Sequence, residues 1–572
     1  MDKEGIIRSL RELAQYLEID GENPFKVRSY IKAAETLEHT DDTIEQLIET
    51  GKLRSLEGIG EAIEKKIIAW AHNEPVPALE KVRSKYPSSL LDLFYVQSLG
   101  AKRIRALYEH LHITNIDELY NACLRGDVAS VPGFNKKIES KIIESIEFLR
   151  EWRGYYLLSD GLNLAESFIR ELGKNINLEN IFIVGSLRRY CDTVRNINLL
   201  IVSDNKERIL NTIKHIYDNN ITVIDSRTVK MYQFPIPIFL HLSHKEDLGI
   251  DTLLLTGSKE YIEKINKMLT EKDFVLNKDG LYKEKNQKIN IETEHQFYQV
   301  TGLPYLPPEL RENFADMDFV FQRALELVRL ENIQGIVHCH TIYSDGQNSI
   351  EELAEYCINR EFKYLVICDH SQSAGYAHGL SIKDIENQHQ EIEKLNEIYK
   401  PFKILKGIEC DIKTDGSLDY PNEILATFDM VIGSVHTKLE MDKNTATSRL
   451  LKAIENPFLD VIGHPTGKLL LSRKGYPIDI ETIAKACVSH QVAIEINANP
   501  LRLDLDWRNI YKAVQMNTKF IISVDAHNLE GIEDLKYGVY TARKGTLLPK
   551  DILNCMNLED MLTWLKEKKS TL

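Results

Sequence analysis

The sequence predicts a multidomain chain in which a helical region and an α+β region precede a C-terminal parallel β/α barrel. The 572 residues correspond to about three to five domains, at the usual size of roughly 100–200 residues per domain. Up to about residue 150, apolar residues recur at three- and four-residue spacing, which predicts helices. Strand-like runs then mix with helices to about residue 300. From about 333 to 530, short apolar runs alternate with helical stretches.

The composition is ordinary for a folded globular protein and excludes several classes. A hydrophobic content of 43% with 27% charged residues excludes wholesale disorder and fibrous proteins. The longest apolar runs fall far short of the about 20 residues that cross a bilayer, and no signal peptide is evident at the N-terminus. Eight scattered cysteines with no CxxC pair are typical of reduced thiols. We therefore expect a cytoplasmic protein with no membrane partner.

One element recurs three times in the helical region. An apolar residue, a tight glycine-containing turn and a helix opening with lysine or arginine occur at 56–60, 96–100 and 131–135. Such a turn leaves the first N–H groups of the next helix unpaired, and with the helix dipole they can bind a phosphate. A single copy is more often an ordinary helical turn, but three copies favour phosphate binding. Because the net charge is −15, DNA contacts would have to use local sites of this kind.

These turns resemble the helix-hairpin-helix (HhH), a motif that contacts the DNA backbone without sequence specificity. The resemblance implies Gly58, Gly60, Gly100 and Gly133 as DNA-backbone residues. In the third copy Asn135 stands where the second glycine belongs. We expect that copy to be weakened but retained, because asparagine tolerates a positive φ.

Seven short apolar runs in the C-terminal region each end in a polar residue. They recur at intervals of about 30 residues, which is typical of repeated β/α units in a parallel barrel. In such barrels the functional groups gather at the C-terminal ends of the strands. The polar ends are His338, His370, Glu409, His436, His464, Glu495 and Asp525.

Nine imidazole and carboxylate groups should converge at this end of the barrel. His338 and His340 lie two residues apart and should point the same way from one strand, and Asp525 and His527 repeat that spacing. Imidazole with carboxylate suits Mn²⁺, Zn²⁺ or Fe²⁺, and nine donors are too many for one ion. Ions about 3.5–4 Å apart can activate a bridging water to attack phosphorus. The predicted metal ligands and catalytic residues are His338, His340, Asp345, His370, Glu409, His436, His464, Asp525 and His527.

The segments HCHTIYSDG, ICDHS, KGIECDI, GSVH, IGHPTG and SVDAH resemble the PHP (polymerase and histidinol phosphatase) family of phosphoesterases. This resemblance implies a distorted (β/α)7 barrel with a centre of three metal ions and no organic cofactor, and all nine metal-binding positions of the family are filled here. The family often has aspartate two residues before the first histidine, where this chain has Ile336. Arg473, Asn499 and Arg502 match residues around the family's site, and we interpret them as supporting the ligands or contacting phosphate.

The middle region, with GSLRR at 185–189, LLLTGSKEY and GLPYLPPELREN, resembles family X DNA polymerases. Together with the helical N-terminus and the barrel, it resembles bacterial PolX over essentially the whole chain. Gly185, Ser186 and Arg189 would then hold a nucleotide triphosphate, and Lys66 would be the Schiff-base lysine of a lyase. The implied domains are a helical lyase-like (8-kDa-type) domain at 1–85, a fingers-like HhH domain at 86–153, a nucleotidyltransferase palm at 154–245, a thumb-like domain and linker at 246–318, and a PHP domain at 319–572.

The carboxylates that the polymerase reaction needs are missing. Two Mg²⁺ ions require an Asp-x-Asp pair on one strand and a third aspartate on its neighbour. Alignment on the surrounding motifs puts Asn196, Asn198 and Phe239 at these positions. We therefore expect a degenerate palm that keeps its fold but has lost nucleotidyl transfer.

Together these observations predict a DNA-binding, metal-dependent phosphodiesterase. We expect a Mn²⁺-dependent 3′→5′ exonuclease of DNA repair that acts on gapped, nicked or 3′-ended DNA without sequence preference. The alternatives are an active gap-filling DNA polymerase X, a PHP phosphatase acting on a small phosphomonoester, and a non-catalytic scaffold that binds DNA ends. The hairpin turns argue against the phosphatase, and the complete ligand set argues against the scaffold.

Overall fold

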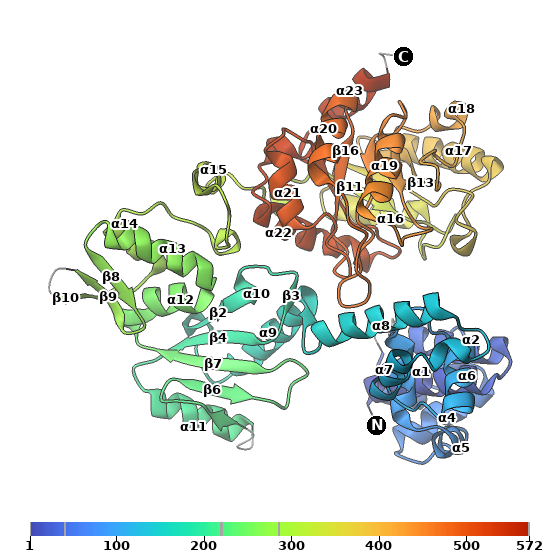
Figure 1. The fold of residues 1–572 in the computed structure, drawn as a ribbon, viewed down its shortest axis with the longest axis horizontal. Helices are drawn as coiled ribbons and strands as arrows, with labels where there is room; N and C mark the ends of the chain where they lie inside the picture. Colours follow the sequence, from blue (N-terminus) through green and yellow to red (C-terminus); the bar gives the residue numbers. More distant parts are fainter. Residues whose placement is uncertain (1, 39, 41, 218–220, 284–286, 570–572) are drawn as a thin grey trace. The chain divides into compact units, whose positions relative to one another are not determined.

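The computed structural model describes residues 2–38, 40, 42–217, 221–283 and 287–569. The chain forms two compact units, Met1–Arg153 and Gly154–Leu572. In Figure 1 the first unit runs from blue to cyan, and the second continues through green and yellow to red. No helix among the described residues is long and apolar enough to cross a membrane.

The first unit is helical, as the sequence predicts. Asp2 caps the first helix by accepting from Gly5 N–H, and Gly21 ends it in the left-handed conformation. Apolar residues spaced three and four apart, such as Leu10, Leu13 and Leu17, are buried in the core of this unit. Its elements are α1 (Lys3–Asp20), α2 (Pro24–Glu38), α3 (Ile44–Glu49), η1 (Leu53–Ser55), α4 (Glu61–Ala71), α5 (Pro77–Lys85), η2 (Ser88–Tyr95), α6 (Ala101–Leu111), α7 (Ile116–Arg125), η3 (Val128–Ser130) and α8 (Lys136–Glu151).

The second unit begins with a five-stranded sheet in the order β2-β4-β7-β6-β5. Strands β4 and β7 are parallel, and the other pairs of this sheet are antiparallel. The elements are β1 (Tyr156–Leu157), α9 (Leu158–Leu172), η4 (Leu178–Asn180), β2 (Ile181–Val184), α10 (Gly185–Arg188), β3 (Thr193–Val194), β4 (Ile197–Val202), α11 (Lys206–Ile216), β5 (Thr222–Val223), β6 (Thr228–Met231) and β7 (Ile238–Ser243).

A smaller antiparallel sheet, β10-β9-β8, follows with its own helices. Arg311 is fully buried here and is paired with Glu294, which also binds Arg188. The elements are η5 (Lys245–Asp247), α12 (Leu248–Thr256), α13 (Lys259–Thr270), β8 (Phe274–Asn277), β9 (Gly280–Lys283), β10 (Gln287–Ile289), α14 (Glu294–Thr301), η6 (Pro308–Leu310) and α15 (Met317–Arg323).

The C-terminal part is a nearly closed barrel of seven parallel strands in sequential order, which confirms the predicted β/α repeat. Hydrogen bonds from Val524 N to Val337 O and from His340 N to Ala526 O join the last strand to the first. The strands are β11 (Gly335–Cys339), β12 (Tyr364–Ile367), β13 (Lys403–Asp411), β14 (Met430–Ser434), β15 (Val461–Ile462), β16 (Ala493–Asn497) and β17 (Phe520–Ser523). They are buried on both faces, as parallel strands covered by helices must be.

Helices surround this barrel and continue to the C-terminal end of the described chain. Ser349 and Ser381 begin two of the helices with capping boxes. The elements are η7 (Leu330–Asn332), α16 (Ile350–Asn359), η8 (Gly375–Ala377), α17 (Ile382–Ile398), α18 (Asn422–Leu425), α19 (Lys443–Ile454), α20 (Ile480–His490), α21 (Trp507–Val514), η9 (Glu530–Asp534), α22 (Leu535–Lys544), η10 (Pro549–Asp551), η11 (Leu553–Cys555) and α23 (Leu558–Lys569).

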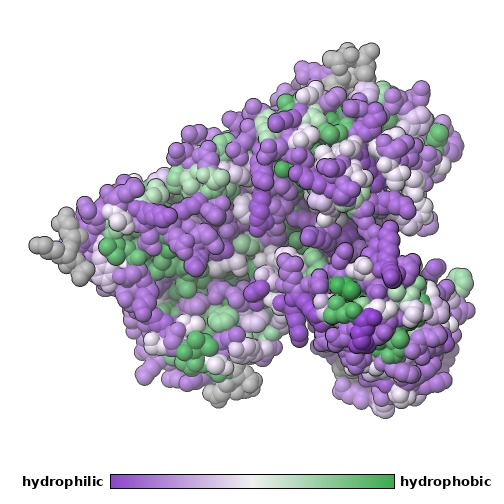
Figure 2. Space-filling view, in the orientation of Figure 1, coloured by the Kyte–Doolittle hydropathy of each residue, from purple (hydrophilic) through white to green (hydrophobic). Residues whose placement is uncertain are grey.

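The surface is mainly hydrophilic on the face shown in Figure 2, with apolar side chains in small, separate patches. A few large apolar side chains are nevertheless well exposed, among them Phe25, Leu325 and Tyr376. Isolated exposed apolar residues are normal in folded proteins. Position therefore decides which of them bears on function.

Candidate functional sites

All nine predicted ligands lie together at the C-terminal end of the barrel. Eight of them form three sets, and within each set the ligand atoms lie within 4.8 Å of one another. His464 joins them because its Nε2 lies 2.9 Å from Glu409 Oε1. The three sets are His340, Asp345, His370 and His527; His338, His340 and Asp525; and His370, Glu409 and His436.

Backbone irregularities, rather than simple alternation along a strand, aim several of these side chains. His338 has a φ of +68°, and the pairing of β11 with β12 shifts register between Val337 and Cys339. The rings of His338 and His340 still lie 5.2 Å apart. Asp525 follows the end of β17 with a φ of +51°. Left-handed non-glycine residues are strained, and such strain concentrates at functional sites.

Glu409 is at the centre of the cluster and is 1% exposed. Its carboxylate lies 3.5 Å from His338 Nε2 and 3.2 Å from His436 Nε2. Burial opposes ionisation, but the imidazoles of His436, His338 and His370 outweigh it and hold the pKa of Glu409 well below its usual range. Glu409 is therefore an anion, the form that ligates a metal ion.

The histidines respond to burial and carboxylates in different ways. Burial lowers the pKa of His340 to about 4, which leaves this imidazole neutral. Burial also opposes protonation of His370 and His436, but Glu409 with Asp345 or Asp411 raises the pKa of His370 to about 10 and that of His436 to about 9. In the absence of a metal ion, protons on His370 and His436 therefore balance the negative charge of the carboxylates. A bound metal ion would displace these protons.

The cluster also fits a metal ion because some of its buried nitrogens are unsatisfied. His338 Nε2, His340 Nδ1 and His464 Nδ1 have no hydrogen-bond partner among the described residues. An unpaired buried polar atom costs about 1–3 kcal/mol, and three in one cluster need a common explanation. Metal coordination would satisfy them, and imidazole with carboxylate is a donor set that binds transition metals.

Three buried acids support the cluster but were not predicted as functional residues. Glu495 accepts from His338 Nδ1 at 2.6 Å and from Ser523 Oγ at 2.6 Å. Asp411 pairs with His436 Nδ1. Asp369, next to a predicted ligand, accepts from Thr341, Ser344 and Gln388. The sequence does contain a signal for each of them. Glu495 is the polar end of an apolar run, Asp411 lies two residues after Glu409, and Asp369 lies one residue before His370.

The predicted phosphate-contacting residues lie at one side of the cluster. Arg502 Nε is 3.3 Å from Asp525 Oδ2. Burial lowers the pKa of Arg502, but nearby carboxylates outweigh burial and raise this pKa above its usual value. Arg473 donates from Nε and Nη2 to Gly467 O, at 3.0 and 2.9 Å. Asn499 Oδ1 accepts from Leu501 N and so shapes the loop that carries Arg502.

The three hairpin turns share one backbone geometry. The third residue of each five-residue turn, which we call the first glycine position, is left-handed. Its φ is +79° at Gly58, +73° at Ser98 and +88° at Gly133. A Cβ on Gly58 would also lie 2.8 Å from Lys32 Cγ. In the second copy, Arg103 Nη1 donates to Ser98 O at 2.6 Å and so fastens the turn.

The fifth residue of each turn, which we call the second glycine position, is the N-cap of the following helix and does not have a positive φ. The φ values are −84° at Gly60, −111° at Gly100 and −157° at Asn135. The expectation that Asn135 depends on tolerance of positive φ is therefore wrong. Instead its side chain accepts from Ile138 N–H, whereas no side chain caps Gly60 or Gly100. Asn135 stabilises its helix but covers part of the end where a phosphate would bind.

The residues at the predicted positions of the polymerase carboxylates lie together on the sheet. Asn198 and Phe239 are register partners on β4 and β7. Asn198 donates from Nδ2 to Asn196 Oδ1 at 2.6 Å, and His241 Nε2 lies 3.0 Å from Asn198 Oδ1. The ammonium of Lys230 lies 4.8 Å from the centre of the Phe239 ring. The three predicted positions therefore carry no carboxylate, and Lys230 adds a positive charge beside Phe239, whereas a two-Mg²⁺ site needs anionic ligands.

The residues predicted to hold a triphosphate surround this face. Gly185 has a φ of +76°, and a Cβ there would lie 2.9 Å from Asn198 Nδ2. Ser186 accepts through its carbonyl from Cys191 N in the turn that follows α10. Arg189 is paired with Glu312 at 3.0 Å and also donates to Thr256 O. These contacts already use the Arg189 guanidinium within the protein.

The predicted lyase lysine lines a separate cavity of about 600 Å³ in the first unit. Lys66 is half-buried, donates to Ala62 O at 2.8 Å and lies 5.6 Å from the centre of the Tyr30 ring. Lys65 beside it is paired with Glu61. The cavity is open to the surface, and Lys66 is positioned at its wall.

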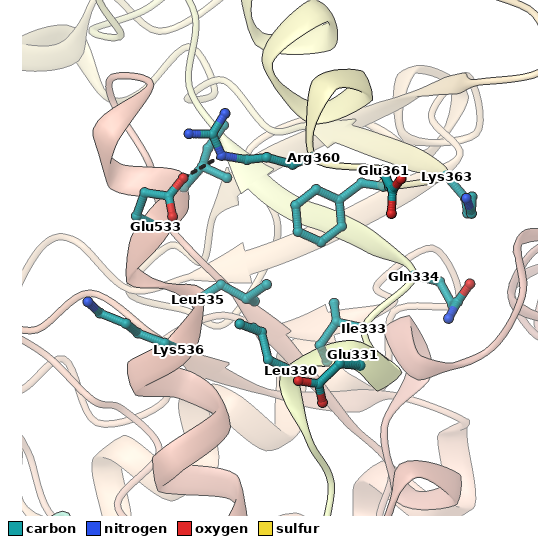
Figure 3. Close-up of a pocket in the computed structure, with 12 residues that line it drawn as sticks. Leu330, Glu331, Ile333, Gln334, Arg360, Glu361, Lys363, Glu533, Leu535 and Lys536 are labelled. Atoms are coloured by element: carbon teal, nitrogen blue, oxygen red, sulfur yellow. Dashed lines mark hydrogen bonds and ion pairs between the residues drawn. The ribbon is translucent and has the colours of Figure 1, made fainter. Parts of the chain in front are cut away.

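Figure 3 shows another pocket, of about 500 Å³. It lies at the N-terminal ends of the first two barrel strands, whereas the cluster lies at the C-terminal ends. Its wall includes Ile333 and Gln334, just before β11, and Lys363, just before β12. The Arg360–Glu533 ion pair crosses its edge. No predicted site residue lines this pocket.

Four family models match successive parts of the chain. They are a helix-hairpin-helix domain at residues 1–74, a SAM-like helix-hairpin-helix tandem at 90–147, the DNA polymerase beta thumb at 252–312 and the PHP domain at 337–499.

Known proteins match either the whole chain or its barrel. The DNA polymerase/3′-5′ exonuclease PolX of Bacillus subtilis (strain 168) is 33% identical over 99% of this chain and 100% of its own length. A probable phosphatase of Thermoanaerobacter sp. (strain X514) is 28% identical over 41% of this chain and 94% of its own. A ternary complex of Leishmania infantum polymerase beta is 17% identical, with a TM-score of 0.25, over 39% of this chain and 97% of that one. Because the match to PolX extends over the full length of both proteins, the chain belongs to the PolX family of DNA polymerases/3′-5′ exonucleases.

Proposed function

We propose that this protein is a Mn²⁺-dependent 3′→5′ exonuclease of DNA repair, and that its polymerase module is inactive. The observation that carries the proposal is the convergence of nine imidazole and carboxylate groups, with unsatisfied buried nitrogens, at the C-terminal end of the barrel. The 3′ ends of gapped or nicked DNA would be the substrates. A full-length relative named as a polymerase and 3′-5′ exonuclease supports this choice.

The metal ions would be held by the nine residues, and we expect three ions, with His340 and His370 each belonging to two of the three sets of ligand atoms. When bound, such ions supply an activated water and stabilise the charge that develops on phosphate. The chain itself orients the ligands: Glu495 and Asp411 engage Nδ1 of His338 and His436, so that the Nε2 atoms face Glu409. Arg502, beside Asp525, would bind the phosphate through its guanidinium.

DNA would be bound through the hairpin turns, whose uncapped helix ends at Gly60 and Gly100 offer backbone N–H groups to phosphates. Such contacts read no bases, so the exonuclease would act without sequence preference. This mode of binding is compatible with the net charge of −15, because it needs no extended basic surface.

Loss of polymerase activity is supported by the charge of the palm face. Amides at Asn196 and Asn198 and a phenyl ring at Phe239 supply no carboxylate, and Lys230 adds a positive charge. Asp251 does not replace these carboxylates, because it lies too far along the strands. It accepts a hydrogen bond from Ser243, which pairs with Val202, four residues beyond Asn198 on β4. These three positions would therefore offer two divalent cations no anionic ligand.

The test uses gapped DNA duplexes carrying a label at the 3′ or the 5′ end, with Mn²⁺, with and without all four dNTPs. The variants are the double substitution His338→Ala/His340→Ala and a matched control, His490→Ala. His490 is an exposed histidine at the end of α20, away from the cluster. We expect stepwise shortening from the 3′ end by the wild type and by His490→Ala, with no extension by either.

The double variant should lose shortening altogether while keeping its fold, as circular dichroism would show. Extension of the primer in the presence of dNTPs, especially if it persisted in the double variant, would contradict the inactive polymerase. A wild type that neither shortens nor extends the DNA would contradict the proposed exonuclease. That result would favour a small phosphomonoester as the substrate.

A further inference from the structure

Tyr376 is an exposed aromatic side chain at the edge of the nine-residue cluster. It lies in η8, on the loop that follows β12 and carries His370, and 67% of its surface is exposed. Its ring centre is 5.9 Å from that of His370 and 6.4 Å from that of His436, and both contacts are edge-on. The ring therefore stands beside the cluster with much of its surface in solvent.

The loop that presents Tyr376 is anchored. Leu380 N donates to His370 O at 2.9 Å, which closes the loop at its base, and Gly379 N donates to Ala374 O at 3.1 Å. Ala374 and Ala377, on either side of the tyrosine, are 0% and 1% exposed. An exposed ring on a fixed loop contributes little to the core, so its position needs another reason.

The surroundings of Tyr376 match the two ends of a nucleotide. Arg502, at the Asp525 side of the cluster, offers a cation for the phosphate. The Tyr376 ring, at the His370 and His436 side, offers a flat apolar surface of the kind on which nucleobases stack.

We propose that Tyr376 stacks on the nucleobase of the 3′-terminal nucleotide whose phosphodiester is cleaved at the cluster. The inference rests on the proposed exonuclease and deepens it by naming a specificity determinant. A base that stacks on Tyr376 has left its own duplex stack, and unstacking is least costly for a frayed, mismatched or single-stranded end. The enzyme would therefore prefer unpaired 3′ termini, and stacking would make it tolerant of base identity.

The experiment pairs two changes in the protein with one change in the substrate. Tyr376→Ala removes the ring, and Tyr376→Phe keeps it without the hydroxyl. Each variant is tested in Mn²⁺ on single-stranded DNA that ends in 3′-thymidine or in a 3′-tetrahydrofuran residue, which lacks the base. The matched control is Ile398→Ala, whose side chain is 66% exposed at the end of α17 that leads into the start of β13.

We expect Tyr376→Ala to lower kcat/KM by roughly 5- to 100-fold on the thymidine end and by less than about 2-fold on the tetrahydrofuran end. Tyr376→Phe and Ile398→Ala should match the wild type on both substrates. The content of bound Mn²⁺ should be the same in all four proteins, which excludes an indirect effect through the cluster.

Three results would overturn the inference while leaving the exonuclease intact. They are an equal loss by Tyr376→Ala on both ends, no loss on either end, and a loss by Tyr376→Phe as large as that by Tyr376→Ala, which would assign the effect to the hydroxyl. A wild type that releases no nucleotide from either end would instead contradict the proposed function, and the stacking inference with it.

Discussion

At the scale of single residues, buried acids determine how the histidines of the cluster are used. Asp369 is fully buried and accepts hydrogen bonds from Thr341 and Ser344, which tie the loop after β11 to the end of β12, and from Gln388 of α17. Burial still raises the pKa of Asp369, so these donors only partly offset its desolvation. Glu495 and Asp411 likewise orient imidazoles rather than face the centre of the cluster. Such supporting partners commonly tune metal affinity as strongly as some ligands do.

The first prediction concerns Glu495, which engages His338 Nδ1 and His464 N. Glu495→Gln keeps the shape of the side chain but removes the charge that holds His338 in place. We expect Mn²⁺ affinity to fall by about 10- to 100-fold with the fold preserved, as measured by calorimetric titration. Glu423→Gln, at an exposed position on α18, is the control and should leave the affinity unchanged. Equal affinities for both variants would show that Glu495 does not support the metal site.

At the scale of elements, the N-cap of each hairpin helix sets a competition between helix stability and phosphate binding. Asn135 accepts from Ile138 N–H and satisfies one of the unpaired groups at the start of α8. The glycines at the same position in the other two copies leave these groups to solvent or to a ligand. A good cap therefore stabilises the helix and obstructs the anion.

The second prediction exchanges these caps. Gly60→Asn should raise the free energy of unfolding by a few tenths of a kcal/mol and weaken DNA binding, because the new side chain caps α4. Asn135→Gly should have the opposite sign in both measurements. Denaturant unfolding gives the stability, and fluorescence anisotropy with a gapped duplex gives the affinity. Changes of the same sign in stability and affinity would rule out this competition.

At the scale of the whole molecule, the hairpin turns and the cluster belong to different compact units. Within the second unit, the palm is joined to the barrel by direct contacts. Tyr190 and Tyr540 stack at 3.8 Å between ring centres, and Lys544, 1% exposed, donates to the carbonyl of Arg189 at 3.0 Å and is paired with Glu312. Glu312 also binds Arg189, so a residue predicted to hold a triphosphate takes part in the junction.

The third prediction follows from this division. A fragment of residues 154–572 should fold, bind Mn²⁺ and cleave a small phosphodiester such as bis(p-nitrophenyl) phosphate at the rate of the full chain. Its affinity for gapped DNA should fall by at least about tenfold, because it lacks the hairpin turns that would bind phosphates. Paired measurements of both substrates on both proteins test this. Undiminished DNA affinity of the fragment would assign DNA binding to the second unit instead.

Much of the fold and of the candidate site follows from the sequence because the signals are local. Periods of two, three and four residues depend only on which faces of an element are buried, so the seven strands and the helical region could be predicted. The nine donors could be named because they lie at or just after the ends of six of the seven apolar runs. Asn198 and Phe239 could be aligned with the expected positions of the polymerase carboxylates because recognisable motifs flank them.

The tertiary structure alone decided the partners that are distant along the chain. Glu495 meets His338 across 157 residues, and Lys544 meets Glu312 across 232. Tyr376 is one of many tyrosines in the sequence, and only its place beside His370 distinguishes it. The left-handed turn at Ser98 was likewise hidden, because serine rarely adopts that conformation. Local patterns determine which faces of an element are buried, whereas packing between elements determines which buried groups meet and how they share protons and charge.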